Sequence, residues 1–181
     1  MSGGQPFIVT AQLPRDLFAW AEALRRAHFP PERNHLAAHV TLFHAFAPSL
    51  RDELKPLLAT LAARFAPVPG RVSGLMNLGR GTAIALDSPG MLALRAEIAE
   101  HFHGALTAQD RHPPRLHITI QNKVDAPAAK ALQQTLAGAI PERAFAFAGL
   151  GLHLYLGPEW QAVGTWPFRG REVVDRDRAR G

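Results

Sequence analysis

The chain has 181 residues, 47% of them hydrophobic and 19% charged, and a formal net charge of +5. This composition is typical of one globular domain with a sizeable core, and the positive charge favours anionic partners such as nucleic acid or phosphorylated small molecules. The sequence contains no cysteine, which excludes disulfides and thiolate metal sites and favours a cytoplasmic location. We expect no secretory signal and no membrane partner, because there is no basic and apolar leader and no apolar run near the ~20 residues of a membrane span.

The expected elements alternate between strands and helices, as judged from apolar periodicity and from Pro and Gly breaks. In chain order they are a strand at 7–13, a helix from Pro14 to before Pro30, a strand at 38–46, a helix with its apolar stripe at 50–65 that Pro67 and Pro69 end, strands at 71–78 and 82–86 joined as a hairpin, a helix from Ser88 to about 103, a strand at 115–124, a helix from Asp125 to about 138, and strands at 145–156 and 161–168.

One four-residue motif occurs twice, as His39-Val40-Thr41-Leu42 and as His117-Ile118-Thr119-Ile120. Each copy lies in a run of strand-forming residues, so its His and Thr share one face and its apolar residues share the other. This composition produces roughly 0.1 such motif by chance, so two copies point to a function. The alternative is two ordinary strands that each carry a hydrogen-bonded histidine.

Each motif strand is followed by a helix, so the order of elements contains a pseudo-repeat of a β-α-β unit. Two similar lobes would place the motif strands opposite each other across one cleft. We therefore expect a single domain of two lobes over residues 1–168, and a basic, mobile tail over residues 169–181.

Two histidines and two threonines around one cleft suit acid–base chemistry at phosphorus. Imidazole titrates near pH 6.5, so one ring can accept a proton from an attacking oxygen while the other donates a proton to a leaving oxygen. Threonine hydroxyls can donate hydrogen bonds to the non-bridging phosphate oxygens. These four side chains are sufficient for phosphodiester chemistry without a metal, and no nearby Asp or Glu offers a third zinc ligand.

With these motifs and this order of elements, the chain resembles the 2H phosphoesterase superfamily. Within it the chain most resembles the bacterial RNA 2',3'-cyclic phosphodiesterases, often labelled 2'-5' RNA ligases. The resemblance implies an α+β, bilobal fold of two pseudo-symmetric β-sheet lobes with outer helices around a central cleft. It also implies metal-independent hydrolysis of a 2',3'-cyclic phosphate to a 2'-phosphate, with His39 and His117 catalytic and Thr41 and Thr119 on the phosphate. It suggests His39 as the acid and His117 as the base, although the residues themselves do not distinguish these roles.

The resemblance implies an RNA end or a small nucleotide cyclic phosphate as the substrate. The alternatives are ATP-independent 2'-5' RNA ligation at the same site, a small cyclic-nucleotide phosphodiesterase, and a non-catalytic RNA-binding module. ATP is not expected as a reactant, because the Gly-containing segment 74–80 lacks the Lys-Ser/Thr ending of a phosphate-binding loop. We expect no cofactor, no obligate protein partner and a monomer.

Four further residues are candidates for substrate contact. Many relatives carry an Ala-Arg pair after the second motif, whereas Gln121-Asn122-Lys123 follows here; by alternation Lys123 either shares the face of the motif and supplies the missing cation, or lies in solvent. His153 and Tyr155 share one face of a strand and point either to the cleft or to solvent. Phe43 shares the predicted face of His39 and either stacks on a base or packs in the core, while His44 points away and is expected to be structural.

Overall fold

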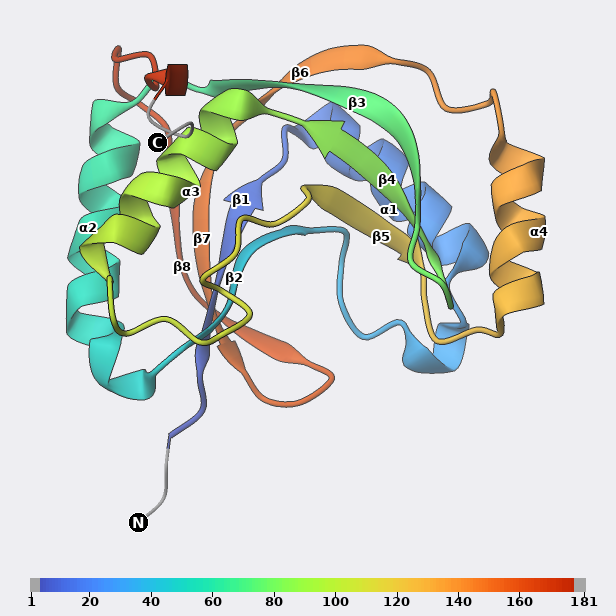
Figure 1. Cartoon of the computed structure of the whole chain (residues 1–181), viewed down its shortest axis with the longest axis horizontal. Helices are drawn as coiled ribbons and strands as arrows, with labels where there is room; N and C mark the ends of the chain where they lie inside the picture. The colour runs from blue at the N-terminus through green and yellow to red at the C-terminus, as the bar shows by residue number, and fades with distance from the viewer. Residues whose placement is uncertain (1–3, 178–181) are drawn as a thin grey trace.

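The computed structural model describes residues 4–177. In it eight strands form two antiparallel sheets, and four α-helices pack on them (Figure 1). The elements are β1 (Phe7–Gln12), α1 (Arg15–His28), β2 (Val40–Phe46), α2 (Arg51–Arg64), β3 (Val68–Asn77), β4 (Thr82–Asp87), α3 (Pro89–His101), β5 (His117–Gln121), α4 (Ala126–Leu136), β6 (Arg143–Phe147), β7 (Gly149–Tyr155) and β8 (Trp160–Pro167), with short 3-10 helices at Pro31–Arg33 and Pro48–Leu50.

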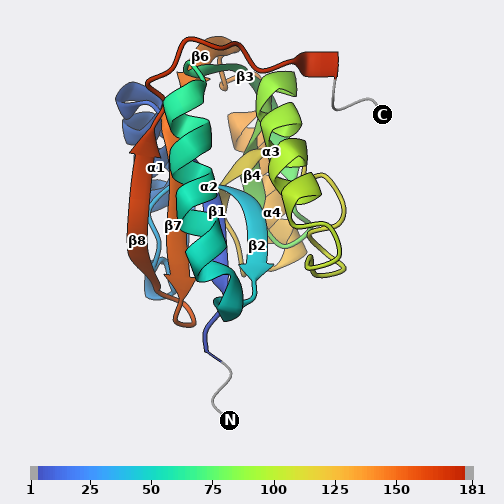
Figure 2. The ribbon, with the colours of Figure 1, turned by 90° about the vertical axis from the view of Figure 1, so that its left-hand side faces the viewer.

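The two sheets form two lobes. The first sheet has the strand order β2-β1-β7-β8, and the second has the order β5-β4-β3-β6. Helix α2 packs on β7 and β8, and α4 packs on β3 and β4, so these helices lie at opposite ends of the molecule (Figure 1). Viewed from the α2 side, the strands of the first sheet lie behind that helix (Figure 2). The predicted bilobal α+β architecture is confirmed.

The two motif strands, β2 and β5, are the edge strands of their sheets and contact each other. This is the juxtaposition that the pseudo-repeat predicted. Helix α1 packs along β5, and α3 packs against β3 of the same sheet. The centre of the molecule is therefore the place where the two sheet edges meet.

Side-chain caps begin helices α3 and α4. The hydroxyl of Ser88 accepts a hydrogen bond from the backbone N–H of Met91, and the carboxylate of Asp125 accepts one from Ala128, so both caps satisfy free N–H groups of the first turn. Proline occupies one of the first two helical positions after each cap, where its missing N–H costs no hydrogen bond. The apolar faces of these helices join one core that spans both sheets.

The predicted strand at 145–156 is wrong as a single element. It is two strands, β6 and β7, which belong to different sheets. The chain crosses from the second sheet to the first at Ala148, whose N–H donates to the carbonyl of Gln12 at 2.8 Å. Small and apolar residues continue through this point, so the sequence pattern does not mark the crossing.

Three other predicted boundaries differ. Strand β2 begins at Val40, so His39 lies just before it, and β5 covers residues 117–121 in place of 115–124. Strand β3 begins at Val68 and includes Pro69, which the sequence pattern placed at the end of the preceding helix. A proline is tolerated there because β3 has only β6 as a neighbour at that end; its pairing with β4 begins at Arg71.

Residues 169–174 pack on the first lobe, although the sequence predicts a mobile tail from residue 169. The last carbonyls of a helix have no partner within it, and here the N–H groups of Arg169 and Gly170 donate to carbonyls at the end of α2, both at 3.0 Å. The carboxylate of Glu172 accepts from Arg64 at 2.7 Å, and Val174 is buried. The last residues of the predicted tail, 178–181, lie outside the described part of the chain.

Within residues 4–177, none of the helices is both long and apolar enough to cross a membrane.

Candidate active site

Both motif histidines are held in the same way. The Nδ1–H of His39 donates to the carbonyl of Ala37 at 2.8 Å, and the Nδ1–H of His117 donates to the carbonyl of Arg115 at 2.7 Å. A carbonyl can only accept, so each Nδ1 carries the hydrogen. The hydrogen bond to the residue two positions earlier therefore leaves each Nε2 free to accept or donate a proton.

The two motifs combine crosswise. His39 and Thr119 line one pocket of about 190 Å³, and His117 and Thr41 line another of about 370 Å³. Each pocket thus receives the histidine of one motif and the threonine of the other. The structure thus brings each motif histidine to the threonine of the other motif.

Each motif ends in a β-bulge at its fourth residue. In the β1–β2 ladder Thr10 pairs with Thr41 and Val9 with Phe43, which leaves Leu42 as an extra residue. In the β4–β5 ladder the residue left over is Ile120. A bulge shifts the alternation of side chains by one position, so the faces predicted by strict alternation fail beyond each bulge.

Phe43 is therefore not a substrate contact, contrary to the sequence-based candidate. The bulge at Leu42 turns both Leu42 and Phe43 into the core, where each is 0% exposed. The ring of Phe43 packs against Phe46 with centroids 4.8 Å apart. His44 takes the exposed position that strict alternation had assigned to Phe43.

A buried arginine ties the first helix to the second motif. Arg25 of α1 donates from Nη1 to the carbonyl of Thr119 at 2.9 Å and from Nε to Asn34 at 2.8 Å. Its guanidinium lies 4.2 Å from the ring centroid of Phe29. Because β5 is an edge strand, the Thr119 carbonyl has no strand partner on that side, and Arg25 supplies the missing donor.

A second buried arginine makes the equivalent tie to the first motif. Arg95 of α3 donates from Nε to the carbonyl of Leu42 at 3.2 Å and from Nη2 to the carbonyl of Asp110. Its guanidinium lies 4.2 Å from the ring centroid of Phe43. The buried Phe43 thus positions the cation that holds the bulge of β2.

The surroundings of His39 differ from those of His117. Trp160 of β8 contacts His39 edge-on, with ring centroids 4.7 Å apart. Burial lowers the pKa of His39 to about 4, and the charges of Arg25, His153 and His117 add to this effect against the hydrogen bond to Ala37. His39 is therefore neutral at pH 7 in the free protein.

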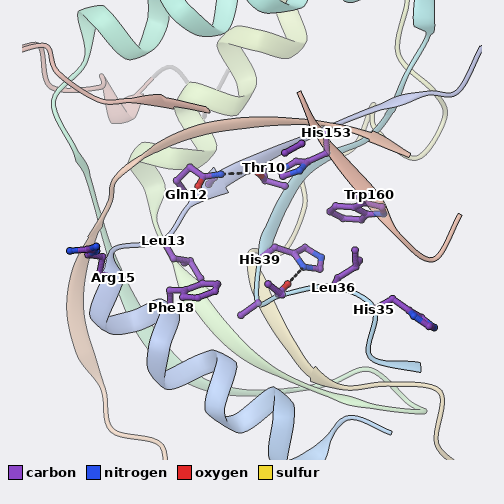
Figure 3. A pocket seen from close by; sticks show the side chains of 14 residues that line it. Thr10, Gln12, Leu13, Arg15, Phe18, His35, Leu36, His39, His153 and Trp160 are labelled. Carbon is purple, nitrogen blue, oxygen red and sulfur yellow. Dashed lines mark hydrogen bonds between the residues drawn. The ribbon is translucent and has the colours of Figure 1, made fainter. Parts of the chain in front are cut away.

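His153, a predicted contact residue, lies in the pocket beside His39 (Figure 3). Its Nε2 shares a 3.0 Å hydrogen bond with the hydroxyl of Thr10, and its ring centroid lies 5.7 Å from that of Trp160. Burial lowers the pKa of His153. The pocket is about 400 Å³ in volume, and Gly151 leaves room for this cluster because a Cβ there would lie 2.6 Å from the Thr10 hydroxyl.

Of the other two predicted contact residues, Lys123 lines a pocket at the motifs in the described part of the chain and Tyr155 does not. Lys123 reaches the pocket of His39 and Thr119, but through a turn, with a φ of 60°, and not through strand alternation. Tyr155 is 41% exposed and pairs with Trp160 in the β7–β8 ladder; within residues 4–177 it lines none of the pockets around the motifs. The structure therefore brings Lys123 to the site and leaves Tyr155 outside these pockets.

Four site residues escaped the sequence analysis. Arg25 and Arg95 lie on the apolar faces of their helices, so a charged residue on an apolar stripe was the available signal. Asp110 sits in a polar loop and Trp160 in a terminal hairpin, and neither carries a local pattern that marks a site.

No group of three or more His, Cys, Asp or Glu side chains suited to a metal ion occurs among the described residues.

Several solved structures are similar to this chain. A Thermus thermophilus protein, TT0787, matches with a TM-score of 0.61 at 17% identity, covering 91% of this chain and 98% of that one. E. coli LigT in its apo form matches with a TM-score of 0.53 at 20% identity, covering 92% and 99%. A protein described as a phosphoesterase matches with a TM-score of 0.53 at 18% identity, covering 91% and 98%. At these identities the likeness shows the fold.

A search of curated proteins finds no match. The family model of the 2'-5' RNA ligase superfamily, however, matches residues 13–159, which include both motifs and the strands that carry them. The chain belongs to the 2'-5' RNA ligase superfamily.

Proposed function

We propose that this chain is a metal-independent phosphoesterase that hydrolyses a 2',3'-cyclic phosphate at an RNA or nucleotide end and leaves a 2'-phosphate. The observation that carries the proposal is the crosswise arrangement of the two motifs. Each histidine has a free Nε2 and shares a pocket with the threonine hydroxyl of the other motif, and the two motif strands contact each other. This set matches what in-line displacement at phosphorus requires.

In the proposed reaction, water attacks phosphorus on the side opposite the 3'-oxygen. One imidazole takes a proton from the water as the new P–O bond forms. The other imidazole gives a proton to the 3'-oxygen as the P–O3' bond breaks. The hydroxyls of Thr41 and Thr119 donate hydrogen bonds to the non-bridging oxygens, whose charge grows in the transition state.

The lowered pKa of His39 favours it as the base, which is the opposite of what the resemblance suggests. A neutral imidazole is ready to accept a proton at pH 7, and burial beside Trp160 and Arg25 keeps His39 neutral in the free protein. His117 then serves as the acid.

The pockets beside the centre suit a nucleotide. The pocket between His39 and His153 is partly apolar, with Trp160, Phe18 and Leu36 in its lining (Figure 3), which suits a base or ribose. LigT, whose fold is similar, has been solved with 3'-AMP, with NADP+ and with ATP. These ligands support a nucleotide substrate for this chain.

A second candidate is ATP-independent 2'-5' RNA ligation at the same site. A 5'-hydroxyl would replace water as the attacking group, with the same two proton transfers. The pockets on both sides of the histidine pair favour this candidate, because they offer room for two RNA ends.

The test uses purified protein in EDTA with an oligoribonucleotide that ends in a 2',3'-cyclic phosphate. Wild type is compared with His39→Ala and His117→Ala, and the terminal phosphate of the product is identified. We expect a 2'-phosphate from wild type, a loss of about 10²–10⁴-fold in each variant, and retained RNA binding. A second oligonucleotide with a 5'-hydroxyl in the same reaction reports ligation as a longer product.

Turnover that survives both substitutions would contradict the paired-histidine mechanism. Wild type that binds RNA but leaves the cyclic phosphate intact would favour an RNA-binding module. A requirement for added divalent metal would contradict metal independence.

A further inference from the structure

We propose that the pocket on the His117 side binds a second phosphate of the substrate, the 5'-phosphate of the nucleotide that carries the cyclic phosphate. This phosphate subsite is defined by His44, His112 and Arg115, which share a pocket of about 370 Å³ with Thr41 and His117. The inference rests on the proposed function, since Thr41 and His117 are there placed on the reacting phosphate. It assigns a role to side chains outside both motifs.

The bulge in β2 aims His44 at this subsite. In a strand without a bulge His44, three residues after Thr41, would lie on the face opposite Thr41. With the bulge, Leu42 and Phe43 are both buried, and the exposed His44 lines the same pocket as Thr41. Re-aiming a side chain in this way is a common role of bulges beside functional sites.

Asp110 fixes the ring of His44. The Nδ1 of His44 donates to the Asp110 carboxylate at 3.1 Å, and the backbone N–H groups of His44 and Ala45 donate to it at 2.9–3.0 Å. Burial would raise the pKa of Asp110, but these hydrogen bonds lower it, so the carboxylate stays ionised at neutral pH. With Nδ1 engaged, Nε2 of His44 is the nitrogen left for a ligand.

Arg115 supplies the charge of the subsite. Its backbone carbonyl accepts the hydrogen bond from His117, and Arg115 lines the same pocket as His117. Among the described residues its exposed guanidinium has no carboxylate partner, whereas Arg64, Arg71 and Arg143 each pair with one. A free guanidinium beside an oriented imidazole is a typical phosphate-binding pair.

The pocket on the other side of the centre combines aromatic and cationic side chains. Trp160, Phe18 and Leu36 contribute apolar surface there, beside Arg15 and His35. A base or ribose on that aromatic surface leaves the His117 side for an anionic group; Arg115 and the buried Arg95 line that side together with Asp110, whose carboxylate accepts hydrogen bonds from His44 and Ala45.

The experiment compares adenosine 2',3'-cyclic phosphate with its 5'-phosphorylated form as substrates. We expect wild type to favour the 5'-phosphorylated form by about tenfold in kcat/KM, as one charge-assisted contact provides. Arg115→Gln reduces this ratio to about one. His44→Asn keeps a nitrogen donor for Asp110 but lacks Nε2, so the ratio falls; His44→Gln, whose amide extends toward the Nε2 position, recovers part of it.

Arg51→Gln is the matched control, because Arg51 is an exposed arginine of α2 that lines none of the pockets around the motifs. It should keep the wild-type ratio. Equal kcat/KM for both substrates in wild type, or an unchanged ratio in Arg115→Gln, would overturn the subsite while leaving the hydrolase intact.

A binding measurement separates the subsite from the proposed reaction. Calorimetry compares adenosine 2',5'-bisphosphate with adenosine 2'-phosphate, which needs no turnover. A bisphosphate preference that Arg115→Gln removes supports the subsite even if wild type hydrolyses neither cyclic phosphate. The absence of any preference in wild type contradicts it.

Discussion

The two halves of the site have the same backbone design and different surroundings. In both, Nδ1 of the histidine donates to the carbonyl two residues earlier, the motif ends in a bulge, and a buried arginine stacked on a phenylalanine holds an edge carbonyl. In the first half, however, His39 lies against a tryptophan ring and has its pKa lowered to about 4.

This difference gives a physical source for the asymmetry of the proposed reaction. The motifs themselves are near copies and specify no direction for proton transfer. Trp160, His153 and Arg25 come from elements outside the first motif, and they keep His39 neutral. In the proposed reaction, surrounding elements, and not the motif, thus favour His39 as the base.

The largest expected effect tests this division of roles. In the 3'-thio analogue of adenosine 2',3'-cyclic phosphate the leaving atom is sulfur, which departs without a proton. We expect His117→Ala to lose about 10²–10⁴-fold in kcat on the oxygen substrate but less than about tenfold on the sulfur substrate. His39→Ala should lose a similar factor on both.

Single-turnover rates of the two variants on the two substrates provide the measurement, with wild type as the reference for the sulfur effect itself. The reverse pattern, with His39→Ala rescued by sulfur, would assign His39 as the acid.

A smaller effect concerns the stability that the two buried arginines provide. Arg25 and Arg95 each donate to a carbonyl of a motif strand, so we expect similar effects when either is replaced. Arg25→Met and Arg95→Met each leave an edge carbonyl without its donor, so we expect each to lower the free energy of unfolding by about 2–4 kcal/mol in urea denaturation. Lysine at either position should not restore stability, because it cannot donate two hydrogen bonds in a fixed plane.

Arg71→Met serves as the control for this series, since Arg71 is exposed and pairs only with the exposed Glu142. Its expected cost is below about 0.5 kcal/mol. A cost that small for Arg25→Met or Arg95→Met would show that these ties do not stabilise the fold.

The smallest expected effect is the pH dependence of stability. The pKa of His39 is about 4 when folded and about 6.5 when unfolded, so the unfolded chain binds the extra proton between these values. Stability is therefore full above about pH 6.5 and falls as the pH drops toward 4. Wild type should lose about 1–2 kcal/mol between pH 7 and pH 5.

The measurement is urea denaturation at pH 7, 6 and 5. His39→Asn retains a side-chain nitrogen donor for Ala37 but does not titrate in this range, so it should remove the larger part of the loss of stability between pH 7 and pH 5. Part remains because the pKa of His153 is also lowered. His103→Ala, at an exposed position, should keep the wild-type slope. An unchanged slope in His39→Asn would contradict the lowered pKa.

The sequence predicted the order of elements up to the strand at 145–156 and the meeting of the two motif strands, because periodicity and repeated motifs are local signals. It missed the crossing between sheets at Ala148, and it assigned the wrong faces beyond the bulge in β2. Phe43 was assigned to the cleft face and is buried, whereas His44 was assigned away from it and is exposed. The sequence carries no signal for an extra residue in a ladder, since a bulge is defined by the pairing with the neighbouring strand.

The sequence by itself determined the pair of histidines and threonines and their strands, since each depends on residue type and short spacing, and the pseudo-repeat of elements together with the family resemblance indicated the two lobes. Tertiary structure alone decided the crosswise pairing of each histidine with the other motif's threonine. It also decided the burial of Arg25 and Arg95 and the contact of Trp160 with His39. These features join residues far apart in the chain, and burial and charge depend on the assembled surroundings.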